Sequence, residues 1–476
     1  MSGRVANRQD AKAAKTASVF LGVRGVLAVT RWWVGAAAAL FVALVGPWPV
    51  RDGAFEDAGY YRASIKAIRG APVRSGPARP LRGGVGAAAI PLAEAATGGW
   101  PRQHLFATRA AGTGGESLQV RALALADGAR TLYLVTADLL LITPAVAQAT
   151  LDALAKGGVP ADRVWVYFGA SHTHSGPGGL GSGLIEQVML GRYRRDFADL
   201  AGTRMAAAIQ QARRGLVPVE IGSASIPVPE PLGNRLVAGA ATDPHLDILA
   251  VRESGGRPLA VALAYAAHPT TLGGEDRGFS GDYPGALARR LEERTGARTL
   301  FFAGAVGSTT VVREDLRGPG GPERLGALLA DAAAAALPRI AYRPEARLAA
   351  LRVPVALPAP QVRLTGWLAL SPVLPWLLLP REAALHVAAV NDVALVGVPG
   401  EFSGEEALWL RATWRARGVR TMPTSLNGEY IGYILPDARY GTGDYEARWG
   451  AMYGPRLGGY FRALIGEALA RVAPAP

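Results

Sequence analysis

The chain has 476 residues, half of them hydrophobic, which is enough for a large domain with a sizeable core and excludes global disorder. It contains no Cys, which excludes a disulfide scaffold, a Cys-ligated metal site and a thiol nucleophile. The net charge of +13 comes from 51 basic against 38 acidic residues, and no basic run alternates with aromatic residues. We therefore expect no nucleic-acid partner.

The N-terminal part combines a basic start with a long apolar run. Residues 1–31 carry six basic side chains and one acidic one, and residues 32–50 then form an uncharged run bounded by Arg31 and Arg51. About 20 apolar residues cross a bilayer, and a basic flank stays on the cytoplasmic side. We expect residues 32–50 to be a transmembrane anchor, with residues 1–31 cytoplasmic and the rest periplasmic or at the cell surface. A cleaved signal segment, which would make the protein secreted, and a buried core helix are the alternatives.

The remainder predicts an α/β fold. Residues 51–84 are expected to form a juxtamembrane helix and a Pro/Gly-rich linker over residues 70–84. Residues 85–476 are expected to form a single large catalytic domain, with mixed or mostly parallel β-sheets flanked by helices. The expected strands are Thr131–Thr136, Val164–Phe168, Leu259–Ala266, Thr299–Phe302 and Val393–Val398. The expected helices are Ala145–Ala155, Tyr193–Arg213, Pro284–Arg294 and Glu323–Ala336.

A second apolar segment lies near the C-terminal third. Residues 364–380 carry no charge but contain Pro372, Pro375 and Pro380, so they cannot form an ordinary spanning helix. One interpretation is a buried loop or short core helix. The other is an apolar flap that touches a membrane or lines a lipid pocket.

Polar side chains follow several of the expected strands. His172 and His174 follow the strand at 164–168, and His268 follows the strand at 259–266. Ser308 and Glu401 stand after two later strands. Functional groups gather beyond the carboxyl ends of parallel strands, so we expect these side chains to meet.

Three histidines and one glutamate suit a mononuclear zinc site. Residues i and i+2 of an extended segment point to opposite faces, so His172 and His174 are not expected to bind the same ion. One would bind the metal, and the other would face the substrate or orient its neighbour. The remaining histidines lack such a setting and are expected to be structural or at the surface: His104, His245 and His386.

Together with the motifs around these residues, the sequence resembles the catalytic domain of the neutral ceramidase family over about residues 85–465. SHTHSGPGG at 171–179 is the most specific match. The other matching motifs follow in family order: VRALALADGARTLYLVTADLLLI, Asn234–Arg235, DPHLDIL, AAHPTT, NDVALVGVPGEF and YIGYILPDARYGTGDYEARWGAMYGP.

The resemblance implies zinc-dependent hydrolysis of the amide bond of ceramide, with one Zn²⁺ per chain. The metal ligands that it implies are His172, His268, Glu401 and Tyr433. The residues that it places around the scissile amide are His174, Arg235 and Tyr445. It also implies a lipid partner, an N-acyl lipid similar to ceramide.

The chain departs from the family in its hydroxyl motif. The family's catalytic serine falls on Thr310, with Ser308 two residues earlier, and the Pro-Asn pair that follows the family serine is missing. Because the chain ends at Pro476, we also expect the family's C-terminal β-sandwich domain to be absent. The alternatives are a metal-dependent esterase or amidase acting on a non-sphingolipid substrate, and a catalytically silent lipid-binding envelope protein.

Overall fold

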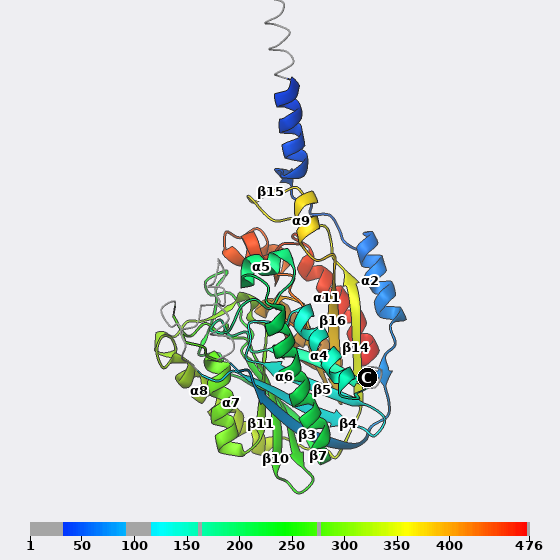
Figure 1. Ribbon diagram of the computed structural model, residues 1–476, viewed down its shortest axis with the longest axis vertical. Coiled ribbons are helices and arrows are strands. Elements are labelled where there is room, and N and C mark those ends of the chain that lie inside the picture. Colours follow the sequence, from blue (N-terminus) through cyan, green and yellow to red (C-terminus); the bar gives the residue numbers. More distant parts are fainter. Residues whose placement is uncertain (1–31, 92–115, 160–163, 274–277, 474–476) are drawn as a thin grey trace, which may run out of the picture.

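Two β-sheets, packed face to face, form the centre of the molecule (Figure 1). The computed structural model describes residues 32–91, 116–159, 164–273 and 278–473. The apolar layer between the sheets includes Leu134 and Tyr167 from one sheet and Val390 and Leu395 from the other.

The larger sheet has nine strands. In spatial order it consists of β11 (Arg298–Ala303), β10 (Pro258–Tyr265), β9 (His245–Glu253), β7 (Val217–Pro227), β3 (Arg79–Ala89), β4 (Gln119–Ala126), β5 (Thr131–Ala137) and β6 (Val164–Ala170), with the short β13 (Glu345–Ala346) beside β3. The pairs β10–β11 and β5–β6 are parallel, and the other pairs are antiparallel.

The smaller sheet has five strands in the order β19 (Arg420–Thr424), β17 (Val393–Gly397), β16 (Glu382–Val390), β14 (Leu348–Ala356) and β2 (Arg74–Ser75). Only β17 and β19 are parallel. Both sheets are therefore mixed, and the expected alternative of mostly parallel sheets is wrong. Short connections such as those between β4 and β5 and between β9 and β10 force antiparallel neighbours, because a parallel pair needs a longer crossover.

Helices cover the outer face of each sheet. On the nine-stranded sheet these are α4 (Pro144–Lys156), α6 (Arg195–Arg214), α7 (Asp282–Thr295) and α8 (Gly321–Ala336). On the five-stranded sheet they are α2 (Gly59–Gly70), α10 (Gly404–Arg415) and α11 (Leu457–Val472). The result is four layers, helix–sheet–sheet–helix (Figure 1). Every strand and helix range expected from the sequence overlaps an observed element of the same type.

The predicted linker over residues 70–84 is wrong. Most of this segment belongs to β2 and the beginning of β3, and α2 packs on the five-stranded sheet, so the folded domain begins before residue 85. Gly84, one of the glycines that suggested a linker, and the nearby Gly86 have a packing role instead. A side chain at Gly84 or Gly86 would overlap backbone atoms of α6, so these glycines let the helix lie close on the sheet.

The two apolar segments noted in the sequence lie side by side. Residues 32–44 are helical, and the chain then forms β1 (Trp48–Pro49), which pairs with β15 (Leu368–Ala369). Hydrogen bonds from the amide of Ser371 to the carbonyl of Val45, and from its hydroxyl to the carbonyl of Ala43, extend this contact. Figure 1 shows the blue helix of residues 32–44, β15 and α9 (Val373–Leu378) at one end of the molecule.

The uncharged run 32–50 is thus not one continuous helix, because its last residues form β1. Within the described ranges, no helix is both long and apolar enough to cross a membrane. Residues 1–31 lie outside the described residues, so the expected cytoplasmic segment stays a prediction.

A buried ionic cluster joins α10 to both sheets. Arg411 on α10 donates to Asp243 (Nε to Oδ2, 3.0 Å), to Asp247 on β9 (Nη2 to Oδ2, 2.6 Å) and to the carbonyl of Thr421 on β19 (2.8 Å). Both aspartates are buried. Because α10 begins three residues after Glu401, this cluster also holds the segment that carries Glu401.

We predict that Arg411→Met lowers the free energy of unfolding by about 3–5 kcal/mol, because it leaves two buried carboxylates without their cation. Urea denaturation followed by circular dichroism measures this loss. Arg415→Met, at an exposed position of the same helix, is the matched control and should change stability by less than about 0.5 kcal/mol. A loss below about 1 kcal/mol for Arg411→Met would show that the cluster does not hold α10.

Candidate functional site

Three strand ends bring His172, His268 and Glu401 together. His172 follows β6, His268 follows β10, and Glu401 begins β18 (Glu401–Phe402) shortly after β17. The His172 and His268 ring centroids are 4.7 Å apart. Glu401 Oε2 lies 3.8 Å from His172 Nε2 and 3.8 Å from His268 Nδ1. The expected meeting of polar groups at the carboxyl ends of the strands is confirmed for these three residues.

His172 presents one ring nitrogen that has no hydrogen-bond partner. Its Nδ1 lies 2.7 Å from the carbonyl oxygen of Leu140, which can only accept, so Nδ1 carries the proton. The lone pair of Nε2 is then free, and this buried atom has no hydrogen-bond partner among the described residues. A buried imidazole nitrogen fixed in this way suits a metal ligand, because metal-binding histidines donate their other N–H to a carbonyl or carboxylate.

His174 belongs to the same cluster. Its ring centroid lies 4.9 Å from that of His172, and its Nε2 lies 2.9 Å from Nε2 of His268. The ligand atoms of the three histidines lie within 4.8 Å of one another, so the three could hold a metal ion. The expectation that His172 and His174 cannot share one ion is therefore not supported by the geometry. Strand β6 ends at Ala170 and His172 has a positive φ of 63°, so the alternation of an extended strand does not apply.

Tyr433 reaches Glu401 through a short pair of parallel strands. It begins β20 (Tyr433–Ile434), which pairs with β18 so that Tyr433 lies opposite Glu401. The Tyr433 side chain is buried, and any side chain at Gly450 would overlap its ring. Tyr430, from the same segment, donates its hydroxyl to Oε1 of Glu401 at 3.3 Å.

Arg235 bridges the groups of the site. It follows β8 (Leu232–Asn234), and its Nη2 lies 3.1 Å from the Tyr433 hydroxyl and 3.4 Å from Oε2 of Glu401. Nη2 also donates to the carbonyl of Gly307 at 3.2 Å. The Nε of Arg235 forms an ion pair with Glu446 at 2.9 Å. Arg235 is thus held by the Tyr433 hydroxyl, by the carbonyl of Gly307 and by two carboxylates, those of Glu401 and Glu446.

The electrostatics of the site follow from burial and from these contacts. Burial alone would raise the pKa of Glu401, but the neighbouring His172 and the charge of Arg235 lower it below its usual value. Burial, and then the charge of Arg235, lower the pKa of His268 well below its usual value. Burial and then the charge of Glu401 raise the pKa of Tyr433 well above its usual value. Glu401 is therefore an anion among neutral donors and one cation.

Tyr445 lies beside Tyr433 and is partly exposed to solvent. It immediately precedes a π-helical turn, Glu446–Gly450, and its ring centroid lies 6.3 Å from that of Tyr433. Its exposed fraction is 36%, whereas Tyr433 is 5% exposed. A substrate that approaches Glu401 past Tyr445 would meet the phenol on its way.

Ser308 and Thr310 have different settings. Ser308 is fully buried, and its hydroxyl accepts a hydrogen bond from the amide of Gly404 at 2.9 Å. Thr310, in β12 (Thr309–Val311), pairs with Gly233 of β8 and is only half-buried. Gly233 stands two residues before Arg235, so Thr310 pairs with the segment that leads to Arg235.

The sequence reasoning missed Tyr430 and Glu446. Both stand inside motifs that were recognised, one or three residues from a predicted site residue, and this proximity was the only available signal. Of the histidines set aside, His245 contacts Asp243 and His386 is buried beside Arg352. His104 lies outside the described residues.

The fold of the chain is similar to that of known proteins. No protein-family model and no curated protein matches the chain. The crystal structure of neutral ceramidase from Pseudomonas aeruginosa superposes with a TM-score of 0.68 at 18% identity, over 84% of this chain and 76% of that chain. A structure of a ceramidase complexed with C2 gives a TM-score of 0.66 at 18% identity, over 84% and 77%. The chain therefore has the fold of these neutral ceramidase structures.

We predict that the purified chain binds about one divalent metal ion and that His172→Ala and His268→Ala each lose most of it. A metal site has few protein ligands, so the loss of one weakens binding strongly. Metal content measured by plasma mass spectrometry checks this, and His245→Ala is the control because it lies outside the cluster. His174→Ala decides whether His174 is also a ligand. Full metal content in both His172→Ala and His268→Ala would disprove the site.

Proposed function

We propose that the protein is a zinc-dependent hydrolase that cleaves the amide bond of ceramide or a related N-acyl lipid. The observation that carries this proposal is the buried cluster of His172, His268 and Glu401, with the unpartnered Nε2 of His172, in a molecule that has the neutral ceramidase fold. Two histidines and a carboxylate are ligands that zinc accepts, and the phenol of Tyr433 is the fourth ligand that the resemblance implies. Zinc bound there would supply Lewis acidity to the carbonyl of the substrate.

The residues around the cluster suit amide hydrolysis. Arg235 stays protonated in its buried position, because Tyr433 and Glu401 raise its pKa although burial alone would lower it. Arg235 and Tyr445 would donate hydrogen bonds to the negative charge that develops on the carbonyl oxygen. His174, half-buried at the side of the cluster, would pass a proton to the leaving amine.

Thr310 is the better candidate for the family's catalytic hydroxyl. The hydroxyl of Ser308 is engaged with the amide of Gly404, which fixes the turn after Glu401. Thr310 pairs with Gly233, two residues before Arg235, and is partly accessible. Its β-branch restricts the approach of a substrate, although the hydroxyl can still act as a nucleophile or hydrogen-bond donor.

We also propose that the protein acts at a membrane. Trp367 is 70% exposed, Leu377 is 69% exposed and Trp376 is 48% exposed, next to the exposed apolar helix of residues 32–44. Exposed aromatic and aliphatic residues in contiguous segments mark membrane contacts. The exposed helix of residues 32–44 would hold the chain at the membrane, with its catalytic part outside the cytoplasm. Protection of that part from protease added to permeabilised outer envelopes would contradict this orientation.

The substrate class is tested by hydrolysis assays on the zinc-loaded chain. We expect release of fatty acid from ceramide, slower release from N-acyl amino acids, and little from an ester of the same acyl chain. Glu401→Gln, which removes the central carboxylate, should abolish all of these activities. Faster cleavage of the ester than of every N-acyl lipid would instead favour a non-sphingolipid esterase. No turnover by a zinc-loaded, folded chain would favour a lipid-binding protein.

Thr310→Val should lower kcat at least about tenfold, or roughly 1.4 kcal/mol of transition-state stabilisation, because it keeps the shape and removes the hydroxyl. Ser308→Ala should cost less and should act mainly through stability. Thr310→Ser should keep or raise the activity on ceramide-like amides. The pattern is wrong if Ser308→Ala abolishes turnover while Thr310→Val leaves kcat unchanged.

Replacing Trp367 and Trp376 with Ser should reduce turnover of ceramide in vesicles by at least about fivefold, but turnover of a short-chain soluble analogue by less than twofold. The two side chains are exposed, so their loss affects delivery from the bilayer and leaves the chemistry unchanged. Vesicle co-sedimentation and the thermal midpoint complete the comparison. Equal losses on both substrates would indicate a folding role.

A further inference from the structure

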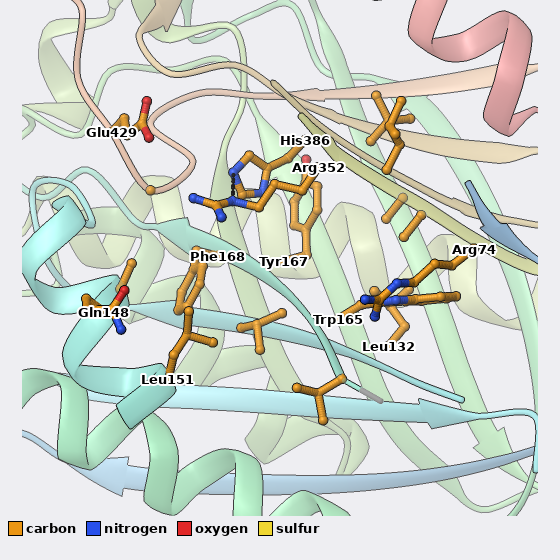
Figure 2. Close-up of a pocket in the computed structure, with 18 of the residues that line it drawn as sticks. Arg74, Leu132, Gln148, Leu151, Trp165, Tyr167, Phe168, Arg352, His386 and Glu429 are labelled. Atoms are coloured by element: carbon orange, nitrogen blue, oxygen red, sulfur yellow. Dashed lines mark hydrogen bonds between the residues drawn. The ribbon is translucent and has the colours of Figure 1, made fainter. Parts of the chain in front are cut away.

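A cavity of about 400 Å³ lies between β6, at the edge of the nine-stranded sheet, and β14 and β16 of the five-stranded sheet (Figure 2). Its walls come from β6, α4, β14 and β16, and no residue assigned above to metal binding or catalysis lines it. This volume lies within the range of about 300–1,000 Å³ that small-molecule sites occupy. The cavity is therefore large enough for a ligand of its own.

One part of the cavity is apolar. Its lining side chains include Leu132, Leu151, Val166, Trp165 and Phe168. Figure 2 shows Leu151 and Phe168 on one side and Leu132 and Trp165 on the other. An alkyl chain lying between them would be removed from water, which is favourable at about 0.8 kcal/mol per buried CH₂ group.

The charged groups that line the cavity are Arg74, Arg352 and Glu429, and the other titratable side chains of the lining are His386 and Tyr167. Glu429 Oε2 accepts a hydrogen bond from the amide of Ala384 at 2.7 Å, so one of its oxygens is already engaged. Burial, and the charges of Glu382 and Glu186, raise the pKa of Glu429, and the charge of Arg352 lowers it. The guanidinium of Arg352 is the group of the lining that can bind the carboxylate of an amphiphilic ligand.

Arg352 and His386 form a defined pair at the cavity. The Nε of Arg352 donates to Nε2 of His386 at 3.3 Å, and Figure 2 shows the guanidinium beside the imidazole. Because arginine can only donate, Nε2 accepts and the proton of the neutral imidazole is on Nδ1. His386 is buried, and burial and then the charge of Arg352 lower its pKa to about 3. The positive charge of the pair is thus confined to Arg352.

We propose that this cavity binds the anion of a single-chain fatty acid, with the carboxylate on Arg352 and the alkyl chain against β6 and α4. A guanidinium next to a neutral imidazole matches the single charge and planar shape of a carboxylate. The proposal concerns a site separate from the candidate active site and does not depend on the proposed function.

The cavity and the candidate active site share a wall. The hydroxyl of Tyr167, which lines the cavity, hydrogen-bonds to Thr424 at 2.6 Å, and Thr424 donates to Asn427 at 2.9 Å. The same segment continues to Tyr430, which contacts Glu401. Binding in the cavity must therefore be distinguished from binding in the active site itself.

The test is isothermal titration of the full chain with decanoate below its micellar concentration. We expect one site per chain, and Arg352→Gln should weaken the affinity at least tenfold. Leu151→Trp, which fills the apolar part, should weaken it by a similar factor. The matched control is Arg290→Gln, an exposed arginine on α7, which should leave the affinity within twofold. Decylamine, with the same chain and the opposite charge, should not bind at this site.

Several outcomes would overturn the proposal. They are unchanged affinity in both Arg352→Gln and Leu151→Trp, binding of decylamine as tight as that of decanoate, and loss of binding in Arg235→Gln with no loss in Arg352→Gln. The last outcome would place the fatty acid in the candidate active site. If Arg352→Gln does not fold, Arg352→Lys and Leu151→Trp decide in its place, with the thermal midpoint as the check on folding.

Discussion

The site depends on one constraint, which is that the carboxylate of Glu401 is almost entirely removed from water. It is 3% exposed, and a buried carboxylate is stable only when cations or hydrogen-bond donors surround it. Arg235 and Tyr430 supply such groups directly, and His172 and His268 face the same carboxylate. Each partner comes from a different loop, so the position of Glu401 requires all of these loops to be placed correctly.

The layered fold meets this requirement. The strands before His172, His268 and Glu401 come from both sheets, and the apolar layer between the sheets fixes their relative positions. The buried cluster around Arg411 then joins α10 to the nine-stranded sheet directly after Glu401. A rigid scaffold that carries its functional groups on connecting loops is a common way to keep such groups in register.

Two further places in the molecule present apolar side chains beside polar or charged groups. The pairing of β1 with β15 joins two apolar segments that are more than 300 residues apart in the chain, and this contact leaves Trp367 and Leu377 exposed at one end. The cavity beside β6 combines an apolar wall with the guanidinium of Arg352. The first is an exposed apolar surface, and the second is a pocket with an apolar wall and a guanidinium group.

The sequence by itself determined the element types, the uncharged runs and most residues of the candidate site. Periodicity, strand-end polar residues and the SHTHSGPGG motif are local, so they can be read without a structure. Only the tertiary structure decided the direction of the sheets, the strands inside the predicted linker, the positive φ that turns His172 towards His174, and the contacts of Glu446 and Tyr430. These features depend on contacts between residues far apart in the chain, and no local pattern specifies them.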